Sequence, residues 1–179
     1  MFHNVVDGFS QVISDLKNPL FAKQDGVCHA VNDLKNIPAG TISKLDMEFE
    51  EPGKPCVKCT FDVKENGTPP KYREYKSYTD ASQIPLPQFL NYLNEITSLS
   101  QLKYIFNAKK LNSQQAKEGM KMFLKTNAAN LYKSFDNGGI GLDKCKQLFG
   151  DEVTSPQKLI SKLDTQEGFN ELLIFVDAK

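Results

Sequence analysis

The segment CTFDVKENGTPPKYREYKSY, residues 59–78, decides the fold that the sequence predicts. Apolar and polar residues alternate up to Val63, a spacing typical of a β-strand with one buried face. Asn66-Gly67 then gives the strongest hairpin signal in the chain, in a loop that residues 68–70 lengthen. Residues 71–78 return to a strand pattern. We therefore predict two antiparallel strands joined by this loop.

The residues before this segment extend the same pattern. From Gly40 to Glu50 the chain again has a period of two, with Leu45, Met47 and Phe49 on one face. Residues 52–55 (Pro-Gly-Lys-Pro) predict the turn that follows. Residues 40–78 as a whole therefore predict a three-stranded antiparallel meander.

Helical spacing dominates the rest of the chain. Asn4 is expected to cap a helix over 5–17, whereas residues 27–31 suggest a short strand. Further helices are predicted from Pro87, from Asn112 or Ser113, and over 142–149. The chain is expected to end in two strands, 158–163 and 169–176. The helix that starts near Ser113 is expected to bury one face, listed as Ala116, Met120, Phe123 and Leu124.

This order of elements predicts an α+β fold. It matches a five-stranded antiparallel OB-like barrel, with a helical insertion between strands 3 and 4 (about 86–150) and an N-terminal helix. The expected organisation is an N-terminal helical extension, residues 1–37, followed by the OB-like domain, residues 38–179.

Composition and charge are ordinary for a soluble protein. The 179 residues (20.1 kDa) are 40% hydrophobic and 25% charged, and no stretch approaches the ~20 apolar residues of a membrane span. The start lacks a secretory signal, and four cysteines are expected to be reduced thiols. We expect a cytoplasmic protein, in the host cytoplasm if it is viral.

Patterns that specify catalysis or metal binding are weak. Cys28 and His29 suggest a nucleophile pair, but neighbours on a strand point to opposite faces. Cys56 and Cys59 have zinc-ligand spacing, yet no second ligand pair completes the four-ligand set of a structural site. We expect no enzymatic activity, no cofactor and no metal. An enzyme of unrecognised type remains an open alternative.

Basic residues are concentrated in two segments of this neutral chain. Residues 54–78 have a net charge of +3 and residues 101–133 a net charge of +6, whereas residues 1–53 have a net charge of −4. Lysines of the second segment, from Lys103 to Lys125, are expected to flank the first. Such segments are typical of a surface for a polyanion, although they also occur as solvated faces.

The strand 71–78 interleaves aromatic rings with cations, the mixture used by single-stranded nucleic-acid binders. Cations neutralise phosphates and rings stack on bases, but only one face of a strand can be exposed. The open alternative is a strand that uses Tyr for β-propensity and Lys for edge protection. The predicted binding residues are Lys58, Lys64, Lys71, Tyr72, Arg73, Tyr75, Lys76 and Lys121.

Short motifs resemble a family of tailed-phage proteins. These are Ile37-Pro38-Ala39-Gly40-Thr41, the Gly53-Lys54-Pro55 turn, the helix 87–93 and the terminal Gly168-Phe169-Asn170. They resemble single-stranded-DNA-binding proteins encoded in replication and recombination cassettes, over residues 37–98 and 158–176. Ile42 stands where that family tends to have Tyr, and the acidic, aromatic-tipped tail of many such proteins is missing. The resemblance implies an oligonucleotide-binding barrel without catalysis.

Two functions follow as hypotheses. The first is single-stranded DNA binding in phage replication or recombination, with replication or recombination proteins as further partners and oligomers possible. The second is a protein-interaction module, a viral inhibitor or adaptor of a host enzyme that does not bind nucleic acid. This hypothesis rests on the zero net charge, on the extra amphipathic helix and on the acidic first 53 residues, which are suited to a basic partner.

Overall fold

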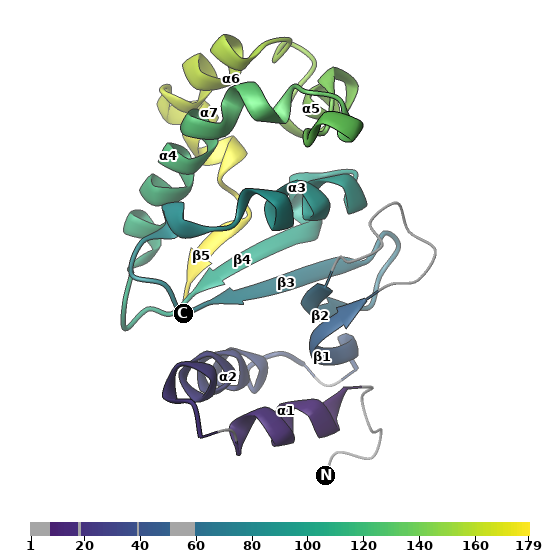
Figure 1. Ribbon diagram of the computed structural model, residues 1–179, viewed down its shortest axis with the longest axis vertical. Helices are drawn as coiled ribbons and strands as arrows, with labels where there is room; N and C mark the ends of the chain where they lie inside the picture. Colours follow the sequence, from purple (N-terminus) through teal and green to yellow (C-terminus); the bar gives the residue numbers. More distant parts are fainter. Residues whose placement is uncertain (1–7, 18, 39, 51–59) are drawn as a thin grey trace.

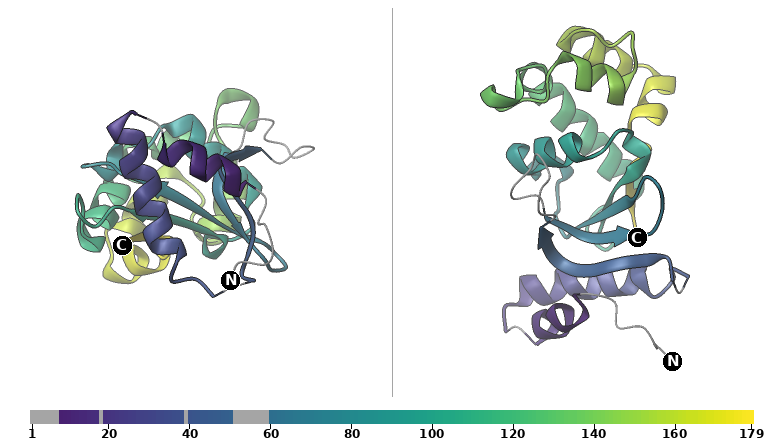
Figure 2. Two further views of the ribbon diagram at one scale, coloured as in Figure 1. Left: turned by 90° about the horizontal axis from the view of Figure 1, so that it is seen from below. Right: turned by 90° about the vertical axis from the view of Figure 1, so that its right-hand side faces the viewer.

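The computed structural model describes residues 8–17, 19–38, 40–50 and 60–179. It has three layers, with α1 and α2 below a central sheet and α3 to α7 above it (Figure 1). The side view in Figure 2 shows the same order, with the N-terminal helices separated from the other helices by the sheet. The lower face of the sheet therefore faces α2, and the upper face faces α3.

The first three strands form the predicted antiparallel meander. They are β1 (Ile42–Glu50), β2 (Thr60–Glu65) and β3 (Lys71–Lys76). The pairing of β2 with β3 runs from Val63–Arg73 to Glu65–Lys71. Beyond it, the backbone N–H of Tyr75 donates to Asp62 Oδ2 at 2.6 Å instead of to a strand carbonyl. Phe61 consequently packs in the upper core although Val63 packs in the lower one.

The predicted barrel is wrong. The sheet is open, has the strand order β1-β2-β3-β4-β5, and is parallel where β3, β4 (Leu102–Phe106) and β5 (Val176–Ala178) meet. The helical connection before β4, and again the one before β5, returns the chain to the end of the sheet at which β3 begins. Strands β4 and β5 therefore run parallel to β3. Strand β4 lies within the segment that was predicted to be a helical insertion.

The upper layer confirms the predicted helices and corrects the C-terminal strands. Helix α4 buries the predicted residues. Residues 158–163 and 169–172 are helical, because Ser155 and Thr165 cap helices by accepting from the N–H groups of Lys158 and Gly168. Residues 173–175 form a turn, and strand β5 begins only at Val176. The helices are α3 (Leu86–Glu95), α4 (Ser113–Leu131), α5 (Leu142–Phe149), α6 (Pro156–Leu163) and α7 (Gln166–Leu172), with 3-10 turns η1 (Ala81–Gln83), η2 (Leu99–Gln101) and η3 (Phe135–Asn137).

The lower layer is a pair of helices, α1 (Phe9–Leu16) and α2 (Phe21–Leu34). The described part of the first predicted helix is confirmed, whereas its proposed cap, Asn4, lies outside the described residues. The predicted strand over 27–31 is wrong, because those residues lie within α2. The N-terminal extension is thus a helical layer that covers part of the sheet.

Two apolar cores of unequal size hold the layers together. The upper core joins buried side chains of the sheet to α3, α4, α5, α6 and α7. The lower core includes, among the residues whose burial is described, Val12, Val27, Ala30, Leu45, Val63, Tyr75 and Ile105. Within the described residues, no helix has the length and apolar character needed to cross a bilayer.

Candidate nucleic-acid interface

Strand β3 divides the predicted binding residues between the two faces of the sheet. Successive side chains of a strand point to opposite sides. Tyr72 and Lys76 therefore lie on the upper face, and Lys71, Arg73 and Tyr75 on the lower face, where α2 packs. The sequence predicted that only one face would be exposed, but in the structure both faces of β3 are largely covered.

Tyr72 and Lys76 are core residues of the upper face. Tyr72 is 1% exposed, and its ring stacks on Phe61 with the centroids 4.1 Å apart. Lys76 is 9% exposed, and its Nζ donates to Glu74 Oε1 and, at 3.2 Å, to Gln88 Oε1. Burial works to lower the pKa of Lys76, but the adjacent carboxylate outweighs this and raises it. Neither side chain is available to a nucleic acid.

Arg73 and Tyr75 are buried on the lower face in a network with Asp33 of α2. Asp33 Oδ2 accepts from Arg73 Nη1 at 2.9 Å and from Tyr75 Oη at 2.8 Å, while Arg73 Nε donates to Glu65. Lys179 Nζ reaches Asp33 Oδ1 at 3.2 Å. Burial acts to raise the pKa of Asp33, but the hydrogen bond from Tyr75 and the nearby cations lower it below its ordinary value. Asp33 is therefore an ionised carboxylate that holds three donors.

Two further polar residues of α2 face the sheet at helical spacing from Asp33. Asp25 accepts from Ser77 Oγ and from Lys110 Nζ at 2.8 Å. His29 Nε2 lies 3.1 Å from a β4 carbonyl oxygen, to which it donates, and burial lowers its pKa. Asp25, His29 and Asp33 are four residues apart and share one face of the helix. This spacing is present in the sequence, but the strand predicted over residues 27–31 is incompatible with it.

Beyond the C-terminal end of α2, four cations gather on the lower face. This cationic patch consists of Lys71, Arg73, Lys103 and Lys179. Arg73 and Lys103 are direct neighbours in the β3–β4 pairing. Partial burial, and then repulsion from Arg73, Lys179 and Lys71, lowers the pKa of Lys103, while Glu65 opposes this. The fold thus holds positive charges side by side, and two of them, those of Lys71 and Lys103, are exposed to solvent.

The remaining predicted residues are not part of this patch. Lys64 is half-buried, with its Nζ 6.0 Å from the centroid of the Tyr72 ring on the upper face. Lys121 lies on α4, 3.1 Å from Asp164. Lys58 lies outside the described residues. The structure therefore brings together Lys71, Arg73 and Tyr75 of the predicted set, and adds Lys103 and Lys179.

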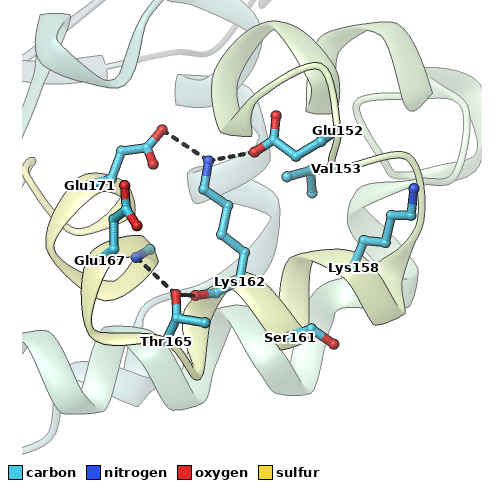
Figure 3. Close-up of a pocket in the computed structure, with 9 residues that line it drawn as sticks. Glu152, Val153, Lys158, Ser161, Lys162, Thr165, Glu167 and Glu171 are labelled. Carbon is cyan, nitrogen blue, oxygen red and sulfur yellow. Dashed lines mark hydrogen bonds and ion pairs between the residues drawn. The ribbon is translucent and has the colours of Figure 1, made fainter.

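A separate open groove of about 490 Å³ lies at α6 and α7 (Figure 3). At its centre, Lys162 Nζ donates to Glu152 Oε1 at 2.8 Å, to Glu171 Oε1 at 2.9 Å and to the Phe149 carbonyl at 2.9 Å. These three acceptors occupy all three N–H bonds of the ammonium group. Lys162 therefore links α6 to its neighbours, and it has no remaining donor for a ligand.

The suggested Cys28–His29 pair does not form a nucleophile site. Cys28 is exposed, whereas His29 is buried and directed at the sheet. From the sequence, the two side chains were expected to diverge because neighbours on a strand point to opposite faces. They diverge instead because both residues lie on a helix, where successive side chains are about 100° apart. Cys145 is buried, and burial raises the pKa of its thiol to about 12, so the reactive thiolate is disfavoured.

Comparison with known proteins adds no assignment to this arrangement. No protein-family model, no curated protein and no solved structure matches the chain. The resemblance of residues 37–98 and 158–176 to phage DNA-binding proteins accordingly stays a prediction.

Proposed function

We propose that this protein is a non-catalytic binder of single-stranded DNA and that the phosphates lie on the cationic patch. The observation that carries the proposal is the position of Lys103, which lies directly beside Arg73 in the β3–β4 pairing and is also repelled by Lys179 and Lys71. Like charges opposite each other on neighbouring strands destabilise a sheet. A bound phosphate removes that penalty, because it supplies negative charge where the repulsion is greatest.

The carboxylates near the patch do not balance its charge. Asp33 is shared between Arg73 and Lys179, and Glu65 is paired with Arg73. Among the described residues, no ion pair uses Lys71 or Lys103. Their exposed ammonium groups are therefore free to exchange small counterions for phosphates, which drives nucleic-acid binding.

The position of the patch favours a flexible single strand over a duplex. Lys71, Arg73 and Lys103 project from two adjacent strands, about 4.8 Å apart, and Lys179, which follows β5, lies beside the end of α2. Duplex readers instead insert a protruding helix or β-ribbon into a groove. Because Tyr72 and Tyr75 are buried, stacking contributes little while α2 is in place, and binding is expected to be electrostatic and insensitive to sequence.

A salt titration tests this proposal. Fluorescence anisotropy with a labelled oligothymidylate compares the wild-type chain with the pair Lys71→Gln/Lys103→Gln. The matched control is Lys133→Gln/Lys146→Gln, two lysines on other elements without described ion pairs. Loss of two phosphate contacts is expected to reduce the slope of log K against log salt by about 1.4. Equal slopes in both variants, tighter binding to duplex, or no binding at low salt contradicts the proposal.

The alternative of a protein-interaction module stays a proposal, but two of the acidic residues on which it rests are paired within the chain. The acidic first 53 residues were expected to face a basic partner. In the structure, Asp25 and Asp33 pair with Lys110, Arg73 and Lys179 of the same chain. The described acidic residues of α2 thus already have basic partners inside the fold.

A further inference from the structure

We infer that the DNA-binding surface continues beneath α2, and that the carboxylates of α2 occupy it as an internal competitor for phosphate. The inference rests on the proposed function and adds its regulation: the exposed cationic patch is the accessible end of a longer site. DNA and α2 then compete for the same donors, so strong binding requires α2 to leave the sheet.

The donors held by Asp33 are suited to a phosphate. An arginine, a tyrosine hydroxyl and a lysine converge on its two oxygens, at 2.9, 2.8 and 3.2 Å. Planar guanidinium groups and hydroxyls recognise phosphate oxygens in the same way as carboxylate oxygens. The donors come from β3 and the end of the chain, whereas the carboxylate comes from α2.

A second set of donors repeats this arrangement at the other end of α2. Asp25 accepts from Ser77 Oγ and from Lys110 Nζ at 2.8 Å, and Asn107 Nδ2 donates to the same serine at 3.2 Å. Asp25 and Asp33 are eight residues apart, about 12 Å along the helix. Between them, the Tyr75 ring packs edge-on against His29 with the centroids 5.5 Å apart. Displacing α2 therefore uncovers two cationic donor sets with an aromatic ring between them.

The attachment of α2 is of the kind that a polyanion can displace. The described contacts between α2 and the sheet side include ion pairs and hydrogen bonds at Asp25 and Asp33, on either side of the apolar contacts of Val27 and Ala30. Around α2 the sheet side supplies several cations, which include Lys71, Arg73, Lys103, Lys109, Lys110 and Lys179. They face three carboxylates, Asp25, Asp33 and Glu65. When α2 is undocked in only a fraction of the molecules, the apparent association constant for DNA is the intrinsic constant multiplied by that fraction.

The test combines DNA binding with hydrogen exchange on the full chain. The variant Asp25→Asn/Asp33→Asn removes both competing charges, and Asp136→Asn/Asp151→Asn is the matched control at two exposed positions. We expect faster exchange in α2 and, for a tenfold larger undocked fraction, oligothymidylate binding that is about tenfold tighter. The control is expected to match the wild-type chain in both measurements.

The outcomes separate this inference from the proposed function. Faster exchange in α2 with unchanged DNA affinity overturns the inference and leaves the exposed patch as the whole site. Unchanged exchange and affinity also overturn it. If neither the wild-type chain nor either variant binds DNA, the proposed function fails and the inference fails with it.

The wild-type chain provides a second test that does not depend on the folding of a variant. Saturating oligothymidylate is expected to accelerate exchange in α2 and to slow it in β3. Protection of α2, or no change in it, shows that DNA and α2 do not compete.

Discussion

Replacing Tyr104 by Phe is expected to stabilise the protein. The Tyr104 ring lies in the upper core and is fully buried. In the described part of the chain, its hydroxyl oxygen and Glu74 Oε2 are the buried side-chain atoms that have no hydrogen-bond partner. A buried hydroxyl without a partner costs about 1–3 kcal/mol relative to its hydrated state. Phe keeps the ring contacts and removes that cost.

The expected gain in the free energy of unfolding is about 1 kcal/mol, because loss of the oxygen also leaves a small void that offsets part of the benefit. For a chain of this length, that corresponds to a rise in Tm of about 2–4 °C. Urea unfolding followed by far-ultraviolet circular dichroism measures the difference directly, and an unchanged m-value shows that the unfolded state is not altered.

Tyr92→Phe is the matched control. Tyr92 is 1% exposed in the same core, but its hydroxyl oxygen accepts from Gln88 Nε2 at 2.8 Å. Its removal leaves a polar partner unpaired, so a loss of about 1–3 kcal/mol is expected. If Tyr104→Phe is as destabilising as Tyr92→Phe, the reasoning is refuted. The Tyr104 hydroxyl then has a partner, for example a buried water shared with Glu74, its register neighbour on β3.

Two further predictions concern packing and pH. A Cβ added at Gly119 of α4 would lie 2.8 Å from the Cβ of Ala81 in η1. The variant Gly119→Ala is therefore expected to lower the midpoint of urea unfolding, despite the better helix propensity of Ala. An unchanged midpoint contradicts this close contact. The lower layer is expected to lose stability as pH falls. The charged groups that face His29 are Asp25, Asp33 and Lys110, and its pKa in the folded chain is lowered. The stability that neutral His29 contributes is therefore lost below pH 6.5, because the unfolded chain takes up the proton first. Asp33, whose folded pKa is also lowered, adds a second loss below about pH 4. His29→Gln is expected to remove the first loss in urea midpoints measured from pH 8 to 3, and a midpoint equally sensitive to pH in this variant contradicts the assignment.

The parts of the fold that the sequence predicted are those with clear local signals. The meander has alternating strands and a hairpin turn, and α4 has regular spacing of its buried residues. Strand β4 was missed because Tyr104, Ile105 and Phe106 are all buried, so the strand reads as a continuous apolar run. Such runs are typical of strands covered on both faces and cannot be separated from helix by periodicity.

The C-terminal error has a different cause. Ser155-Pro156 is a strong helix-start signal, with a capping side chain followed by proline at the first helical position. Leu159 and Leu163, four residues apart, are both buried on the same helix face. These signals were present in the sequence, but the predicted pair of strands flanking residues 165–168 disregards them. Choosing strands there completed the five-strand barrel order, which the open, partly parallel sheet contradicts.

Helix α2 shows why the candidate site was only partly predictable. Its inner face includes Asp25, His29 and Asp33 as well as Val27 and Ala30, so the apolar pattern expected of a packed helix is interrupted by polar residues. Those residues contact β3 and β4 through hydrogen bonds and ion pairs that sequence spacing alone does not pair. The cations of β3 were recognised as unusual from the sequence. One carboxylate partner of Arg73, however, is Asp33, which lies 40 residues earlier in the chain, and only the packing of α2 on the sheet brings the two side chains together.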